Sequence, residues 1–118
     1  MYEYNAKVIK VVDGDTVDLM VDLGFDTWKS VRCRMHGINA PESRTRDLEE
    51  KKRGLAAKAR LIEILDQNDN TIILKSHGVG KYGRCLGDLI VGDDENRRSI
   101  NLQLINEGHG EEYFGGKR

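Results

Sequence analysis

Apolar and polar residues alternate along the first 36 positions of the chain and predict three β-strands. Residues 2–12 are rich in β-forming side chains and end at the turn pair Asp13-Gly14. Residues 16–23 place four apolar side chains on one face: Val17, Leu19, Val21 and Leu23. In residues 27–36, one face of the expected strand carries Val31, Cys33 and Met35, and the opposite face carries Arg32, Arg34 and His36. A period of two is typical of a strand with one buried face, so we expect a hairpin over residues 16–36.

The middle of the chain changes to a helical period. Residues 37–43 contain Pro41, the only proline, and are expected to form a loop. From about Thr45 to Leu65, apolar residues recur at helical spacing: Leu48, Leu55, Ala59 and Ile62. Gly54 lies inside this helix and is expected to weaken it slightly.

The last third of the chain returns to short elements. We expect a buried strand over residues 71–75, a glycine-rich loop over 76–83 and a further strand over 84–91. Ser99 can cap a short helix over residues 100–107 that has three apolar residues on one side: Ile100, Leu104 and Ile105. Residues 109–118 are expected to form a loosely ordered tail.

This order of elements favours a fold that is mainly β with some α. Five short strands, a helix between the third and fourth strands and a short C-terminal helix fit a small barrel of the OB type. The length of 118 residues suits a single domain over residues 1–118. We expect it to act as a monomer.

Composition and charge narrow the functional classes. With 19 basic and 20 acidic residues the net charge is −1, so sequence-blind coating of nucleic acid by bulk charge is not expected. Residues 29–60 nevertheless hold ten basic and four acidic side chains, and this basic segment is either a solvated helix face or a local anion-binding surface. No apolar run reaches the roughly 20 residues needed to span a bilayer. The N-terminal residues do not resemble a signal peptide, so we expect a cytoplasmic protein without a membrane partner.

The number of cysteines and the spacing of the histidines argue against a disulfide framework and a zinc site. Two cysteines, Cys33 and Cys85, exclude a disulfide framework and leave either two thiols or one bridge. His36, His77 and His109 do not follow the spacing of a zinc motif, so a zinc site is not expected.

Three short clusters at strand-to-loop junctions carry candidate chemistry. They are Asp13-Gly14-Asp15-Thr16, then Arg34 with Asn39-Ala40-Pro41-Glu42, and Lys81-Tyr82-Gly83-Arg84. Each alone also fits an ordinary turn or a surface salt bridge. Together they offer oxygen ligands for a hard cation, a carboxylate that can take a proton from water, and cations that can hold a phosphate. Hydrolysis of a phosphodiester requires these groups.

These clusters resemble the staphylococcal nuclease (thermonuclease) family. The similar segments are residues 13–17, 34–42 and 81–87, in the family's order and with similar spacing. The resemblance implies an OB-fold barrel that cleaves DNA and RNA with Ca²⁺ and leaves 5′-hydroxyl and 3′-phosphate ends. It also implies individual roles. Asp15, Asn39 and the main-chain carbonyl of Ala40 would be calcium ligands, with Asp13 as an acid near the metal, and Glu42 would be the general base. Arg34 and Arg84 would bind the scissile phosphate, and Lys81 and Tyr82 would contact a terminal phosphate, with Tyr113 as the nearest candidate for base stacking.

One departure from the family pattern affects the expected activity. The family usually has Asp where this chain has Asn39, which removes one negative charge from the metal site. The number of charged ligands is one of the factors that set Ca²⁺ affinity, so we expect weak calcium binding. Two functions follow: a calcium-dependent nuclease acting on DNA, RNA or both, or a weak or inactive OB-fold module that binds single-stranded nucleic acid or a protein partner.

Overall fold

The computed structural model describes residues 2–79 and 85–113, which form eight strands and two helices. In chain order these are β1 (Glu3–Asp13), β2 (Thr16–Asp22), β3 (Trp28–Met35), β4 (Gly37–Asn39), α1 (Leu48–Gln67), β5 (Thr71–Val79), β6 (Cys85–Val91), β7 (Arg98–Ser99), α2 (Ile100–Asn106) and β8 (Glu111–Tyr113). The predicted hairpin is confirmed as β2 and β3, which pair antiparallel from Thr16 opposite Arg34 to Asp22 opposite Trp28.

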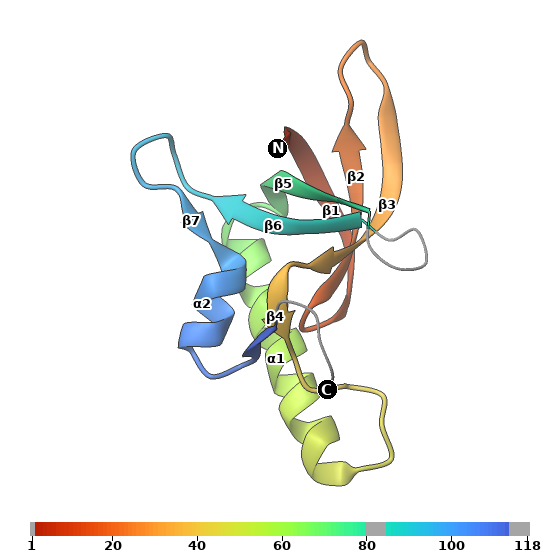
Figure 1. The fold of residues 1–118 in the computed structure, drawn as a ribbon, viewed down its shortest axis with the longest axis vertical. Helices are drawn as coiled ribbons and strands as arrows, with labels where there is room; N and C mark the ends of the chain where they lie inside the picture. Colours follow the sequence, from red (N-terminus) through yellow and green to blue (C-terminus); the bar gives the residue numbers. More distant parts are fainter. Residues whose placement is uncertain (1, 80–84, 114–118) are drawn as a thin grey trace.

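Five of the strands close into a barrel (Figure 1). β1 lies between β2 and β5, β2 pairs with β3, and β5 pairs with β6, all antiparallel. A parallel pairing of β3 with β6, in which Cys33 lies opposite Cys85, joins the two edges. Closure removes the exposed edges of the sheet. The order and the closure confirm the predicted OB-type barrel.

The barrel interior is filled by the alternating apolar residues of its strands. Val17, Leu19 and Cys33 are 0% exposed, and Met35 is 1% exposed, as the period of two predicts. Leu23 lies one residue beyond the end of β2 and is 44% exposed, so it does not continue the buried face. Cys33 and Cys85 are free cysteines whose Sγ atoms lie 3.5 Å apart.

Helix α1 forms in the predicted region but turns a different face to the barrel. The predicted apolar positions Leu48, Leu55 and Ile62 are all at least 40% exposed. The buried face consists of small residues in the first half of the helix and larger apolar residues near its C-terminal end: Gly54, Ala57, Leu61, Ile64 and Leu65. The apolar period gave the wrong face because the N-terminal half of the helix contacts backbone, where only small residues fit. Asp47 caps the helix by accepting hydrogen bonds from the N–H groups of residues 49 and 50.

The loop predicted over residues 37–43 is confirmed only from residue 40 onward, where Pro41 lies. Residues 37–39 form β4, which pairs antiparallel with β8 near the C-terminus, so residues 111–113 are also not a loose tail. Three residues are too few to show a period, and the partner is more than 70 positions away, which hides this pairing from sequence patterns. β5 likewise continues to Val79, across a bulge where Gly78 takes a positive φ of 100°.

Helix α2 confirms its predicted cap and core face. The Ser99 hydroxyl accepts a hydrogen bond from the N–H of Leu102, and Ile100 and Leu104 are 0% exposed. In the described part of the chain, no helix combines the length and the apolar character needed to cross a membrane.

Candidate active site

Two loops, residues 13–16 and 40–43, are held together by small residues of α1. A Cβ atom added at Gly54 would lie 2.3 Å from the carbonyl oxygen of Glu42, so the second loop lies directly on the helix backbone. A Cβ atom added at Gly14 would lie 2.8 Å from the Cβ of Ala57, one turn further along α1. The glycine and alanine of α1 thus form the surface on which both loops rest. The predicted weakening of the helix by Gly54 is offset by this close approach.

Hydrogen bonds connect the two loops directly. The Ser43 hydroxyl donates to the carboxylate of Asp13, and the N–H of Ala40 donates to Oδ2 of Asp15 over 2.9 Å. The N–H of Met35 donates to the carbonyl oxygen of Asp15 over 2.8 Å, which adds the end of β3 to the same unit. The first two predicted clusters therefore converge in space.

Asp15 provides a buried carboxylate at the centre of this unit. The residue is 9% exposed, and its Oδ1 accepts a hydrogen bond from the Thr16 hydroxyl over 3.0 Å. Nη2 of Arg34 lies 3.5 Å from its Oδ2. A carboxylate has about four acceptor positions, so these neighbours orient Asp15 and leave it able to accept further contacts.

Arg34 is fixed by main-chain oxygen atoms. Its Nη1 donates to the carbonyl of Met35 over 2.9 Å and to that of Ile38 over 2.7 Å. Among the described residues, nothing accepts a hydrogen bond from its Nε–H. A guanidinium held in this way is preorganised to donate its remaining N–H groups to an anion.

Glu42 differs from Asp15 in its exposure. Its backbone is fixed against Gly54, whereas its side chain is exposed, and no described residue donates a hydrogen bond to its carboxylate. An exposed carboxylate on a fixed backbone can reach solvent water, which suits a group that accepts a proton. Asn39 is half-buried in β4, where its backbone pairs with Glu111 of β8.

The oxygen atoms near Asp15 are of the kind that bind a hard cation such as Ca²⁺. Asp15, Asn39 and the Ala40 carbonyl offer oxygen atoms, the ligand type that Ca²⁺ prefers. Only one buried carboxylate is present among them. In the described residues, Asp13, Asp15 and Glu42 do not bring carboxylate oxygens within 4.8 Å of one another as a group. The chemistry of these residues therefore fits Ca²⁺, but with few charged ligands.

Three of the predicted site residues, Lys81, Tyr82 and Arg84, lie outside the described residues. In the sequence, Arg84 immediately precedes Cys85, and Cys85 pairs with Cys33 next to Arg34. Tyr113 belongs to β8, where its backbone pairs with Gly37 of β4.

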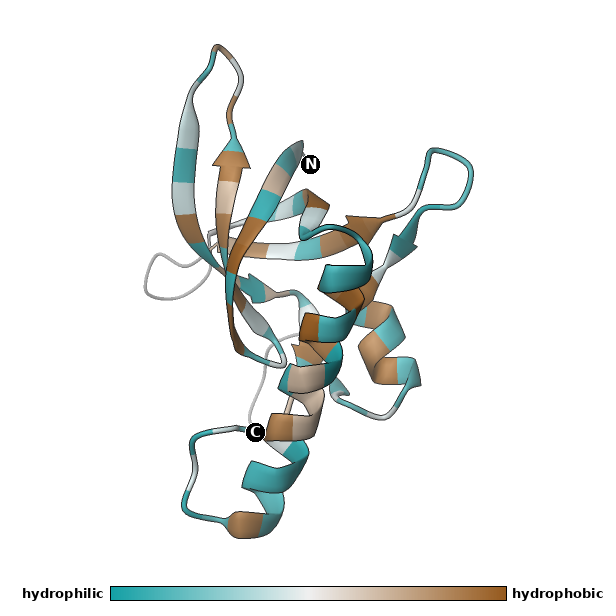
Figure 2. Ribbon diagram, turned by 180° about the vertical axis from the view of Figure 1, so that it is seen from behind, coloured by the Kyte–Doolittle hydropathy of each residue, from teal (hydrophilic) through white to brown (hydrophobic). Residues whose placement is uncertain are grey.

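The basic segment predicted from the sequence, residues 29–60, runs from β3 into the N-terminal part of α1. Lys51, Lys52 and Arg53 are exposed, and none forms an ion pair with another described residue. They follow directly on the loop that contains Glu42. Figure 2 shows the first turns of α1 and the preceding loop mostly in the hydrophilic colour. The first turn of α1 also contains Glu49 and Glu50, which offset part of this positive charge.

Two groups of residues were not predicted from the sequence. Gly54 and Ala57 support the loops, and their spacing of three on one helix was a signal for close packing that could have been used. His36, His77 and Asp88 form a separate group whose nitrogen and oxygen atoms lie within 4.8 Å of one another. No local motif marks this group, because its members come from three separate segments.

Comparison with known proteins identifies the family of the chain. The family model described as "Staphylococcal nuclease homologue" matches residues 32–117. Protein ParB of Escherichia coli is 29% identical over 112 residues, which are 90% of this chain and 55% of that protein. Micrococcal nuclease of Shigella flexneri is 27% identical over 111 residues, 90% of this chain and 56% of that protein.

A third relative is much longer. Endonuclease YhcR of Bacillus subtilis strain 168 is 30% identical over 118 residues, which are 95% of this chain and 9% of that protein. The chain thus spans about half the length, or less, of these curated relatives. Two of the three are named as nucleases, which supports a nuclease-like domain at the level of the family. With the family model matching most of its length, the chain belongs to the staphylococcal nuclease homologue family.

Proposed function

We propose that this protein is a calcium-dependent nuclease that hydrolyses the phosphodiester bonds of DNA, RNA or both. One observation carries the proposal. Arg34, held by backbone carbonyls at the end of β3, lies beside the buried carboxylate of Asp15, and the neighbouring loop holds the backbone of Glu42, whose carboxylate is exposed. This arrangement combines an oxygen ligand for a cation, a cation for a phosphate and a proton acceptor.

Asp15, Asn39 and the carbonyl of Ala40 would hold Ca²⁺, with Asp13 nearby to orient the second loop through Ser43. When bound, Ca²⁺ would supply a positive charge that stabilises the extra negative charge on the attacked phosphate. Because Asn39 is neutral, the site has one charge fewer than a pair of carboxylates would provide, and we expect weak binding.

We assign proton transfer and phosphate binding to Glu42 and Arg34. Glu42 accepts a proton from a water molecule as the water oxygen attacks phosphorus. The bond from phosphorus to the 5′ oxygen breaks, that oxygen takes a proton from solvent to become a 5′-hydroxyl, and a 3′-phosphate remains. Arg34 donates N–H groups to the phosphate oxygens throughout.

Other residues are proposed to bind the substrate. Arg84 is the second phosphate-binding arginine, and the pairing of its neighbour Cys85 with Cys33 supports this role. Lys81 and Tyr82 are proposed contacts to a terminal phosphate, and Tyr113 a base-stacking residue. The exposed cations of α1 would attract the nucleic acid in a salt-dependent way. We propose that the chain acts as a monomer formed by one domain.

The contacts that the Asp15 carboxylate already makes favour a second function, binding without cleavage. The carboxylate accepts hydrogen bonds from Ala40 and Thr16 and lies near the positive charge of Arg34. With Asn39 adding no charge, these contacts can stabilise Asp15 without a metal. The protein would then be an OB-fold module that binds single-stranded nucleic acid, or a protein partner, without cleaving.

The deciding experiment is cleavage of single- and double-stranded DNA and of RNA by the full chain, with Ca²⁺ and then with excess EGTA. We expect cleavage with Ca²⁺ and its loss with EGTA. The products should carry 3′-phosphates, so a polymerase should extend them only after a 3′-phosphatase has removed the phosphate. Binding of single-stranded oligonucleotides without cleavage at millimolar Ca²⁺ would overturn the nuclease and support the binding module.

A further inference from the structure

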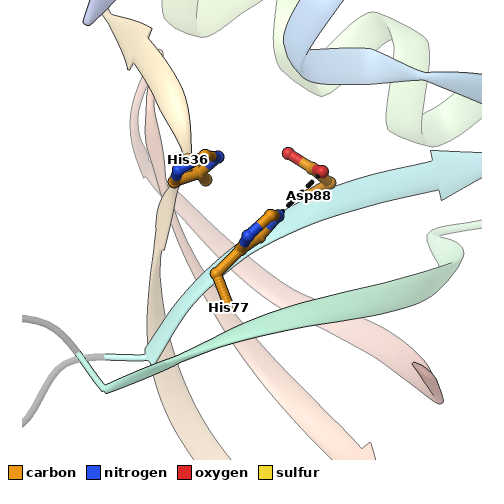
Figure 3. A group of neighbouring side chains, drawn as sticks. All are labelled: His36, His77 and Asp88. Atoms are coloured by element: carbon orange, nitrogen blue, oxygen red, sulfur yellow. Dashed lines mark hydrogen bonds and ion pairs between the residues drawn. The ribbon is translucent and has the colours of Figure 1, made fainter. Parts of the chain in front are cut away.

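Two histidines and an aspartate gather on the outside of the barrel, apart from the loops described above. His36 lies between β3 and β4, His77 in β5 and Asp88 in β6 (Figure 3). One ligand atom from each lies within 4.8 Å of the others, and Nε2 of His77 is 3.0 Å from Oδ2 of Asp88. The two imidazole rings stack, with centroids 3.9 Å apart and planes inclined by 15°.

The strand register explains why these residues meet. Asp88 lies opposite Lys75 in the β5–β6 pairing, and His77, two residues further along β5, lies on the same face of the sheet. The bulge after Ser76 bends β5 at this point. The N–H of His36 donates to the carbonyl of Gly87 over 2.8 Å, which attaches the third residue to β6.

A buried asparagine of α2 fixes the group from behind. Asn101 is 2% exposed, and its Nδ2 donates to Oδ1 of Asp88 over 3.1 Å and to the carbonyl of His36 over 2.7 Å. Its Oδ1 accepts a hydrogen bond from the N–H of Leu89 over 3.1 Å. Outer hydrogen bonds that orient a carboxylate in this way are typical of metal sites, because they leave its other oxygen directed at the ion.

The surroundings of His36 favour its neutral form. Burial and the neighbouring His77 lower the pKa of His36, while Asp88 opposes this shift. A neutral imidazole has a lone pair for a metal, whereas two stacked imidazolium ions would repel each other. A single carboxylate also balances part of the charge of a divalent ion.

We propose that His36, His77 and Asp88 bind a divalent transition-metal ion of the Zn²⁺ type. Two imidazoles and one carboxylate leave a fourth position open for water or another ligand. Bond lengths of about 2.1 Å require donor atoms no more than about 4.2 Å apart, so the separations of up to 4.8 Å must shorten. A ring nitrogen binds a metal in the plane of its ring, so one of the two stacked imidazoles must rotate out of the stack for both to bind the same ion.

This site differs in chemistry from the oxygen donors around Asp15. Imidazole nitrogen favours zinc and other transition metals, whereas calcium selects oxygen. A bound ion would connect the end of β3 to β5 and β6, two residues from Arg34. The proposal does not depend on nuclease activity, since it rests on a separate set of residues.

The test uses the full chain, freed of metal by chelation, titrated with Zn²⁺ against a chromogenic chelator. We expect one bound ion, and at least about a tenfold loss of affinity in each of His77→Gln and Asp88→Asn, because each removes a ligand. His109→Gln is the matched control and should bind like the unmodified chain, since His109 lies outside the group. Unchanged affinity in His77→Gln, or an equal loss in His109→Gln, would overturn the proposal.

A second measurement needs no variant and so does not depend on how the variants fold. Zn²⁺ is titrated into the unmodified chain while the nitrogen resonances of its three histidine rings are followed by NMR. We expect the His36 and His77 resonances to shift to saturation together, with His109 unchanged. Shifts confined to His109, or no shift at a stoichiometric amount of Zn²⁺, would contradict the site.

Discussion

The Asp15 and Glu42 loops and the histidine group are both candidate cation sites, but they are built in different ways. The first uses oxygen atoms from two loops that rest on α1 at Gly54 and Ala57. The second uses two side chains on strands and one between β3 and β4, fixed by the β5–β6 register and by one buried asparagine of α2. The donor types differ accordingly, with oxygen suited to Ca²⁺ in one region and nitrogen suited to Zn²⁺ in the other.

The difference shows which kinds of site a sequence reveals. Loop residues that act together are often neighbours in the chain, as in residues 13–16 and 39–42, so they appear as motifs. Side chains that meet across strands are separated by the length of the connections between them. His36 and His77 are 41 positions apart, and only their register brings them together.

The largest expected effect comes from Glu42→Gln, which removes the proposed proton acceptor and keeps the size of the side chain. We expect the rate of DNA cleavage at saturating Ca²⁺ to fall by about 10²–10⁴-fold, with oligonucleotide binding nearly unchanged. Glu95→Gln, in an exposed turn of the barrel, is the control and should retain full activity. Equal cleavage by Glu42→Gln and the unmodified chain would remove Glu42 from the mechanism. Zn²⁺ affinity should be the same in all three proteins.

The second effect tests whether α1 positions the loops. Gly54→Ala would gain about 1 kcal/mol of helix propensity, but its Cβ would lie 2.3 Å from the Glu42 carbonyl, a backbone atom that cannot rotate away. Overpacking of this kind costs about 1–3 kcal/mol, so we expect net destabilisation together with a loss of cleavage. Unfolding in urea and cleavage rates at a temperature where the variant is folded measure the two effects.

The control for this variant separates stability from positioning. Ala59→Gly, at an exposed position of the same helix, should cost about 1 kcal/mol and leave the cleavage rate of the folded protein unchanged. A Gly54→Ala protein that is more stable than the unmodified chain and equally active would show that the loop does not depend on this contact.

The barrel, and the segments that its loops bring together around Asp15, could be predicted from patterns that are visible in the sequence. Alternation in residues 16–36 gave the correct inner face, because one face of each strand is buried. The clusters around Asp15 and Arg34 stood out because several of their members are neighbours in the chain, whereas the roles of these residues came from a family resemblance and stay predictions. β4 was missed because a three-residue strand has no period, and the buried face of α1 was assigned wrongly because glycine and alanine carry little hydrophobic signal.

A third prediction concerns charge at the oxygen site alone. Asn39→Asp adds a negative charge to the proposed calcium ligands, and we expect about tenfold tighter Ca²⁺ binding by calorimetry. Asn106→Asp, at the exposed end of α2, adds the same charge elsewhere and should leave Ca²⁺ affinity unchanged. Unchanged or weaker Ca²⁺ affinity in Asn39→Asp would count against this ligand. Its Zn²⁺ affinity should stay the same, which would sharpen the distinction between the two regions.

The smallest effect concerns an ion pair that connects α1 to the end of α2 and belongs to neither candidate site. Arg60 of α1 contacts both carboxylate oxygens of Glu107, just after α2, with Nε 2.6 Å and Nη2 3.0 Å from them. Hydrogen bonds from Arg60 and Gln103 lower the pKa of Glu107 to about 2, from an ordinary value of 4.5. A lowered carboxylate pKa stabilises the fold above about pH 4.5, and this contribution is lost as the pH falls towards 2.

Glu107→Gln should therefore reduce the free energy of unfolding by no more than about 1 kcal/mol at pH 7, because the pair is partly exposed. The difference from the unmodified chain should shrink towards pH 2 in urea denaturation. Cleavage and Zn²⁺ binding should both be unchanged if each site is fixed by its own contacts, at Gly54 and Asn101. A loss of Zn²⁺ affinity with cleavage intact would instead show that the histidine group depends on the docking of α2, and so is the less rigid of the two regions.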